Sequence, residues 1–64
     1  MGKIRRGNYV FITFVGDHGP RHVHVYRDER LVLKWDLENG ETMKGKPIAK
    51  LLSIIRDLQD EGEL

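Results

Sequence analysis

All three histidines of the 64-residue chain lie within seven residues of one another, at positions 18, 22 and 24. His22 and His24 are separated by a single residue, so on an extended strand both imidazoles leave the same face about 6.6 Å apart. Two imidazoles at that spacing can work as a general acid and a general base, or they can bind one metal ion together. This segment is therefore the strongest candidate for chemistry in the sequence.

Acid–base chemistry by histidines is suited to the cleavage of RNA, in which the substrate's own 2′-hydroxyl is the nucleophile. In the strand register that best separates polar from apolar residues, His22 lies beside Asp36 and His24 beside Lys34. A carboxylate there would orient an imidazole, so the candidate catalytic residues are His22, His24 and Asp36. The side chains expected to contact phosphates and bases are those of Arg21, Arg27, Lys34 and Tyr26.

A zinc site is the metal-dependent alternative. Asp17 or His18 could add a third ligand to His22 and His24 and leave one coordination position open, as catalytic zinc sites do. Two ligands on a strand and one on a loop would be poorly preorganised, so we expect modest affinity for zinc and no other cofactor. The remaining alternative is that these histidines only form the solvent-facing side of a strand.

Turn signals and alternation predict an α+β fold that would carry this segment. We expect an antiparallel β-meander of three or four strands over 8–15, 21–27, 31–37 and 41–44, with Asn39-Gly40 as a two-residue hairpin turn. Pro47 should open a C-terminal helix that ends near Asp60 and packs its apolar stripe on one face of the sheet. The chain is short enough for a single domain, 1–64, with 1–7 and 61–64 frayed.

The faces of this sheet depend on one turn. Val23 and Val25 should point to the helix and the two histidines away from it, if a three-residue loop pairs Arg27 with Leu31. A two-residue turn would move one whole strand to the opposite face. An open face with apolar residues needs a cover, and we expect a homodimer or a small cognate protein partner. The apolar residues expected on that face are Tyr9, Phe11, Tyr26 and Val32, whereas those expected in the core include Val10, Ile12 and Leu31.

Composition narrows the class of protein further. The chain has no cysteine, which excludes a thiolate metal site and a cysteine nucleophile. No apolar run approaches the roughly 20 residues of a membrane helix, and the start lacks the pattern of a signal peptide, so we expect a cytoplasmic protein with no membrane contact. Residues 1–35 carry seven Lys or Arg against three acidic residues, whereas residues 36–64 carry four against seven. A basic sheet could therefore hold phosphate.

The histidine segment also resembles a family of very small bacterial proteins of unknown function. Members of that family are often encoded beside another small protein in what looks like a toxin–antitoxin pair. The resemblance implies a component of such a module and supports the location of the site. The acid–base chemistry and the basic residues described above add the expectation that the protein binds or acts on RNA, and that it is ribonuclease-like if it is an enzyme. A non-catalytic protein-interaction module, metal-binding or not, is the alternative. The matching positions are Asp17, His18, Pro20, His22, His24, Val25 and Tyr26, then Trp35-Asp36-Leu37, Gly45-Lys46 and Pro47, with departures at Arg21 and Val23.

Overall fold

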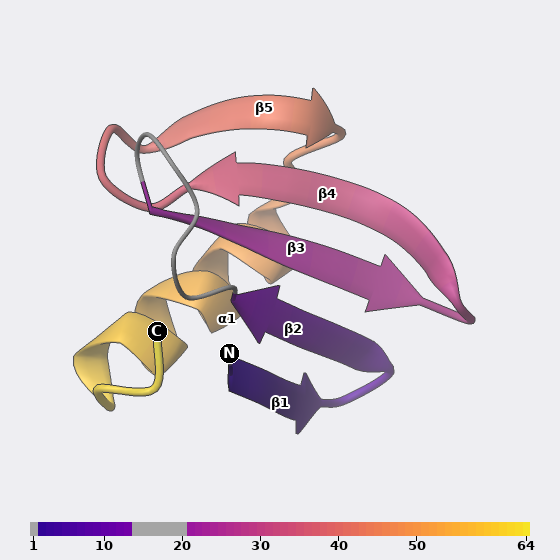
Figure 1. Cartoon of the computed structure of the whole chain (residues 1–64), viewed down its shortest axis with the longest axis horizontal. Coiled ribbons are helices and arrows are strands. Elements are labelled where there is room, and N and C mark those ends of the chain that lie inside the picture. Colours follow the sequence, from indigo (N-terminus) through magenta and orange to yellow (C-terminus); the bar gives the residue numbers. More distant parts are fainter. Residues whose placement is uncertain (1, 14–20) are drawn as a thin grey trace.

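A computed structural model describes residues 2–13 and 21–64, so Asp17 and His18 lie outside the described part of the chain. The described residues form one five-stranded antiparallel sheet, whose strands lie in chain order, and one C-terminal helix behind it (Figure 1). The predicted α+β meander is confirmed, with one strand more than expected. The elements are β1 (Gly2–Arg6), β2 (Tyr9–Thr13), β3 (His22–Arg27), β4 (Arg30–Asp36), β5 (Glu41–Gly45) and α1 (Ala49–Asp60).

The first strand and the residues that follow α1 contact each other and the core. Strand β1 pairs along its whole length with β2, and the pair is joined by a two-residue turn in which Gly7 has a φ of +63°. The Arg6 guanidinium donates two hydrogen bonds, of 3.1 and 3.0 Å, to the Glu61 carboxylate just after α1. Leu64 packs against the core. The first strand and the last residues therefore hold one another in place.

The turn between β3 and β4 is shorter than expected, yet the predicted faces are correct. Arg27 pairs with Arg30, so the loop has only two residues, and both Asp28 and Glu29 have the positive φ that a type I′ turn needs. The register then shifts by one residue between Val25 and Tyr26. This β-bulge compensates for the shorter turn, so beyond it the pairing is the predicted one.

The bulge exchanges the places of two neighbouring residues. Leu31 pairs with Tyr26, whereas Val32 is the extra residue and packs against the core, the reverse of the prediction for both. Gly45, at the end of β5, lies against this bulge with a φ of +89°. A Cβ atom at Gly45 would overlap the carbonyl oxygen of Val32. Only glycine satisfies both conditions.

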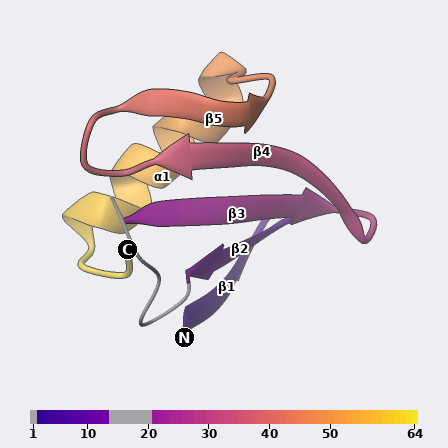
Figure 2. The same ribbon diagram turned by 45° about the horizontal axis from the view of Figure 1, so that its top comes forward.

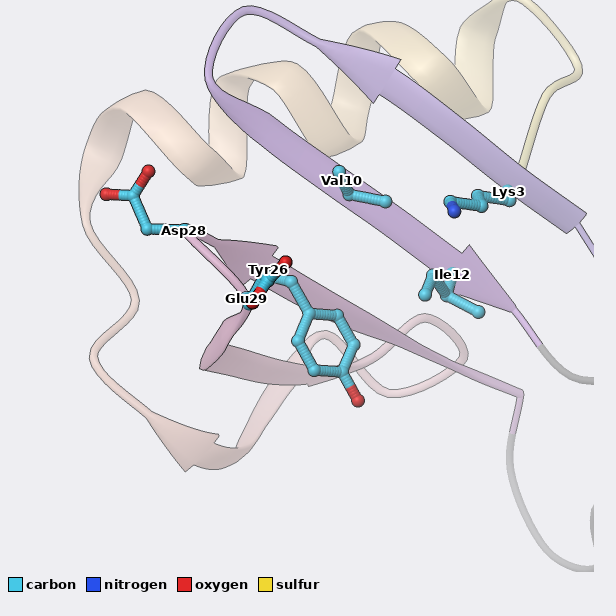
Figure 3. A pocket seen from close by; sticks show the side chains of 6 residues that line it. All are labelled: Lys3, Val10, Ile12, Tyr26, Asp28 and Glu29. Carbon is cyan, nitrogen blue, oxygen red and sulfur yellow. The ribbon is translucent and has the colours of Figure 1, made fainter.

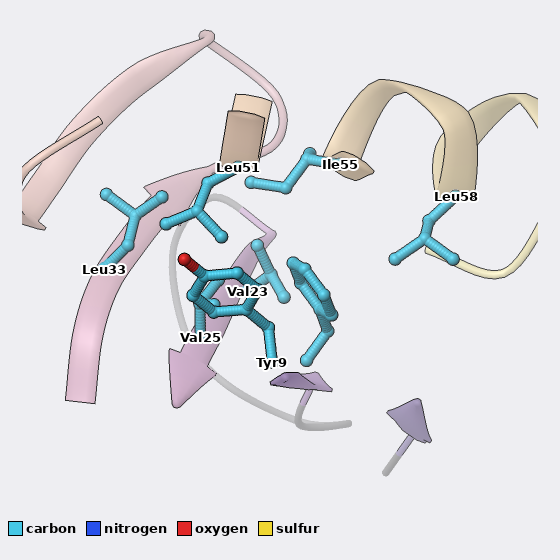
Figure 4. Packing of buried hydrophobic residues seen from close by; sticks show 8 residues of the cluster. Tyr9, Val23, Val25, Leu33, Leu51, Ile55 and Leu58 are labelled. Carbon is cyan, nitrogen blue, oxygen red and sulfur yellow. The ribbon is translucent and has the colours of Figure 1, made fainter. Parts of the chain in front are cut away.

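The core lies between the sheet and α1 (Figure 4). Its sheet side comes from the three central strands, and it includes Tyr9 and Phe11, which the sequence had placed on the open face. Val10 and Ile12 face the other way, because Val10 pairs with Tyr26 and Ile12 with His24. The prediction for β2 was therefore wrong about which of its two faces is buried. The buried apolar residues are Tyr9, Phe11, Val23, Val25, Leu33, Leu51, Ile55 and Leu58.

Helix α1 begins at Ala49, two residues later than predicted. Ile48 is extended, with a φ of −77° and a ψ of 149°, and its side chain is 44% exposed rather than buried in the stripe. The other expected stripe residues, from Leu51 to Leu58, do face the sheet. In Figure 2 the helix lies behind the sheet and leaves the opposite face uncovered. No helix in the described ranges has the length and apolarity needed to cross a bilayer.

Candidate nucleic-acid interface

The face of the sheet opposite α1 carries a row of five residues, of which three are lysines and one is a histidine. Phe11, Val25 and Leu33 are register partners that point into the core, so the residues of the adjacent register row point to the open face. The resulting row, which we call the cationic row, crosses all five strands. Neighbouring strands are about 4.8 Å apart, so the row is roughly 19 Å long. It consists of Lys3, Ile12, His24, Lys34 and Lys44, each paired with the next.

This arrangement works against the stability of the free protein. Lys34 and Lys44 are direct cross-strand partners, and His24 lies on the other side of Lys34. Like charges directly opposite one another destabilise a sheet. A bound polyanion would remove that repulsion, because each phosphate would neutralise a cation of the row.

His24 belongs to the cationic row, and His22 lies beside the row and contacts His24. Their ring centroids are 5.0 Å apart and the ring planes meet at 66°, which is an edge-to-face arrangement. His22 pairs with Asp36 and His24 with Lys34, which confirms the predicted register. Both rings are half-buried. Two adjacent imidazoles beside cations can bind a phosphodiester, and they can take a proton from an attacking hydroxyl group and give one to a leaving oxygen.

Asp36 has a structural role that the sequence did not predict. One carboxylate oxygen accepts hydrogen bonds from the backbone N–H groups of Glu38 and Asn39, each 2.9 Å long, and the other accepts one of 2.7 Å from the Asn39 side chain. These bonds, above all those from Asn39, lower the pKa of Asp36, and the nearby His22 adds a smaller electrostatic effect. The residue is only 5% exposed. Its carboxylate therefore holds the β4–β5 loop rather than serving His22 alone.

That loop also differs from the expected Asn39-Gly40 turn. Asp36 pairs with Glu41, so four residues connect the strands. The backbone N–H of Gly40, whose φ is +67°, donates to the carbonyl oxygen of Asp36 at 2.9 Å. Asn39 does not have the positive φ that the predicted turn requires. It instead donates hydrogen bonds to the Asp36 carboxylate.

The predicted phosphate-binding residues divide between different surfaces. Lys34 and Tyr26 are on the open face. The Arg27 guanidinium instead lies 5.7 Å from the centroid of the Tyr9 ring on the helix side. Arg21 precedes β3 and is exposed, and its backbone N–H donates to the Glu38 carboxylate at 2.8 Å.

Sequence reasoning missed three cations of the open face. Lys3 and Arg5 alternate with the partly buried Ile4 in β1, and Lys44 lies on β5. The alternation of Lys3, Ile4 and Arg5 was a signal for a strand edge, but it was interpreted as a frayed terminus. Together with Lys34 these residues make the open face more basic than predicted.

The zinc prediction rests partly on residues outside the described ranges. Within 2–13 and 21–64, no three His, Asp or Glu residues lie close enough together to hold a metal ion. His22 and His24 could supply two ligands from adjacent positions. A third would have to come from Asp17 or His18, as the sequence suggested.

A scan against models of protein families found none that matches this chain. Searches of curated proteins and of solved structures also found no match.

Proposed function

We propose that this protein binds RNA through the open face of its sheet, as a component of a bacterial toxin–antitoxin-like module. The observation that supports binding is the cationic row, in which Lys34 and Lys44 repel each other without an anion. Phosphate contacts dominate the affinity of proteins for nucleic acids. Tyr26 adds an aromatic ring on the same face for base contacts. The module context comes from the resemblance of the histidine segment.

RNA cleavage by the histidine pair is the enzymatic form of this proposal. One neutral imidazole would take the proton of the 2′-hydroxyl as its oxygen attacks phosphorus. The other, protonated, would donate a proton to the departing 5′-oxygen as the P–O5′ bond breaks, leaving a 2′,3′-cyclic phosphate. The 5.0 Å separation of the His22 and His24 rings supports this division of roles.

The test of binding compares two matched double variants. We expect Lys34→Gln/Lys44→Gln to weaken binding to a 12-nucleotide RNA and to reduce the slope of log K against log salt by roughly 1.4, about 0.7 per lost contact. Lys46→Gln/Lys50→Gln changes the charge equally, but Lys50 lies over Tyr9 on the helix side. That control should retain the parent slope. Failure of the parent protein to retain RNA at low salt would overturn the proposal.

The test of cleavage uses expression in bacteria and a folding control. Growth arrest that is abolished by His22→Ala or His24→Ala, with the parent pattern of amide chemical shifts retained, would support catalysis. The product should be a cyclic phosphate in vitro. If the protein binds RNA but does not cleave it, the nuclease proposal is excluded and only RNA binding remains.

A non-catalytic protein-interaction module is the second candidate. The observation that favours it is the engagement of the Asp36 carboxylate by the loop, which weakens the case for a histidine–aspartate pair. Its partner would be a second copy or the small protein encoded beside it. Sedimentation at high micromolar concentration and co-purification with the neighbouring product test these two partners. A monomer with no partner counts against both.

Zinc binding is tested separately from RNA binding. Ligand imidazoles must be neutral, so binding should weaken as the pH falls below the ordinary histidine pKa of about 6.5. Zn²⁺ should then shift the ring signals of His22 and His24 together and saturate near one equivalent. Ring signals that ignore the metal would exclude the site.

A further inference from the structure

A hollow of about 220 Å³ opens on the open face beside the cationic row (Figure 3). Its floor is apolar, because Val10 and Tyr26 are register partners and Ile12 lies on the same face two residues along β2. Its ends differ in charge. Lys3 lies at one end, and the Asp28-Glu29 turn lies at the other.

These surroundings match a particular kind of ligand. The ring of Tyr26 and the side chain of Ile12 offer flat and apolar contact to an aromatic group. The Lys3 ammonium would contact a phosphate attached to that group. The Asp28 carboxylate lies 4.0 Å from the Arg27 Nε and is exposed, and Glu29 adjoins it in the turn. Both carboxylates can only accept hydrogen bonds when ionised, so the turn favours a ligand edge that carries N–H groups.

We propose that the hollow seats one unstacked base of a single-stranded RNA and prefers a base that carries an amino group. This inference rests on the proposed RNA binding. Cytosine presents an amino group where uracil presents a carbonyl oxygen, and a carboxylate accepts from the former and repels the latter. A duplex keeps its bases stacked inside, so it could reach only the cationic row.

The hollow adjoins the cationic row, so the same RNA strand could contact both. Lys3 both lines the hollow and begins the cationic row, since it pairs with Ile12 in the register that continues to His24. A strand whose phosphates follow the row therefore brings one base to the hollow. Bases that stack on aromatic side chains without sequence preference are common in single-strand binding, and here the turn carboxylates add selectivity.

The experiment measures fluorescence anisotropy with 12-nucleotide oligocytidylate, 12-nucleotide oligouridylate and a 12-base-pair RNA duplex. We expect the parent protein to bind oligocytidylate about fivefold more tightly than oligouridylate. The double variant Asp28→Asn/Glu29→Gln should bind both more tightly, because two negative charges are gone, but with the difference abolished. Lys34→Gln, as the matched control on the row, should weaken both equally and keep their ratio.

The aromatic contact is tested by two variants at one position. Tyr26→Leu should weaken single-strand binding by at least about fivefold and leave duplex binding unchanged, whereas Tyr26→Phe, which keeps the ring, should retain it. Amide chemical shifts verify that both variants fold. RNA binding with no base preference, or with no effect of Tyr26→Leu, would overturn the base site alone. Absence of all RNA binding at low salt would overturn the proposed function and the base site together.

Discussion

The two faces of the sheet carry opposite kinds of residue at alternate positions of the same strands. On the covered face Phe11, Val25 and Leu33 are fully buried beneath α1. At the adjacent register positions of the same strands, the open face presents Ile12, His24 and Lys34. The covered face contributes apolar burial and hence stability, whereas the open face concentrates charge at the expense of stability. Substitutions on the two faces should therefore separate folding from binding.

The largest expected effect comes from neighbouring residues of β2. Phe11→Ala should lower the free energy of unfolding by about 3–5 kcal/mol through lost burial and a cavity. That is a large fraction of the roughly 3–10 kcal/mol expected for a chain of this length. Ile12→Ala on the open face should lower it by less than about 1 kcal/mol. Urea denaturation measures both, and a larger loss for Ile12→Ala than for Phe11→Ala would mean that β2 has the opposite face inward.

A substitution at Gly45 tests the bulge at Val32, which keeps the residues of β4 on their correct faces. Gly45→Ala should lower the free energy of unfolding by on the order of 3 kcal/mol, because the new Cβ overlaps Val32 and the positive φ is strained. Gly40 is the matched control, since its φ is also positive but its Cβ would meet nothing within 4 Å. Gly40→Ala should lower it by only about 1–2 kcal/mol. Similar losses for both would show that the close contact at the bulge is unimportant.

The carboxylate of Asp36 should make the stability of the fold depend on pH in the acid range. Its pKa is lowered in the folded state, so it stabilises the fold above its unfolded pKa of about 3.9, and that stabilisation disappears as the pH falls through the folded value. Asp36→Asn should lower the melting temperature at pH 7 by on the order of 5 °C.

Thermal unfolding between pH 7 and pH 3 should show a flatter acid limb for Asp36→Asn than for the parent. Glu61, whose pKa is lowered by Arg6, provides the comparison on the far side of the molecule. Glu61→Gln removes an exposed ion pair and should change stability much less. Parallel acid limbs for parent and Asp36→Asn would show that the Asp36 carboxylate is not the group involved.

The smallest expected effect has the opposite sign. Lys34→Gln removes the repulsion from Lys44 and should raise the free energy of unfolding by a few tenths of a kcal/mol at low salt. The gain should shrink as salt screens the charges. Chemical denaturation at two salt concentrations measures it. A loss of stability would mean that repulsion between Lys34 and Lys44 does not destabilise the free protein.

The sequence predicted the elements better than their faces. Strand β3 alternates valine with histidine, so its core side was evident, and its register with β4 was predicted correctly from His22 to Val25 but not at Arg27. Strand β2 has apolar residues at successive positions, Tyr9 to Ile12, and such a run contains no polar side to identify the solvent face. Its orientation was therefore wrong. The pairing of Phe11 with Val25 decides it, and pairing is a tertiary property.

The β3–β4 turn shows how two errors can cancel. We expected three residues because a two-residue turn would invert the faces. The structure has the two-residue turn and a compensating bulge at Val32. Bulges leave little trace in a single sequence, although Gly45, the glycine against this one, was visible. Gly7-Asn8 was a recognisable hairpin signal before β2, and overlooking it concealed β1.

The residues of the candidate site on β3 and β4 were placed correctly on the open face, whereas those on the outer strands β1 and β5 were missed. His22, His24, Lys34 and Tyr26 do share the open face, because all four follow from the alternation of β3 and its register with β4. Lys3 and Lys44 belong to the outer strands, and the sequence gives no direct measure of how five strands align. Asp36 was placed beside His22 correctly, but its hydrogen bonds to the loop could not be inferred from spacing.

The cationic row ends in lysine at both outer strands, Lys3 on β1 and Lys44 on β5. An uncovered outer strand is a template on which other chains can add and aggregate, and lysine is a common protection against this. A polyanion that neutralises these lysines would remove the protection while it occupies the face. Colloidal stability should then depend on the ratio of nucleic acid to protein: lowest near charge balance, and restored when either component is in excess.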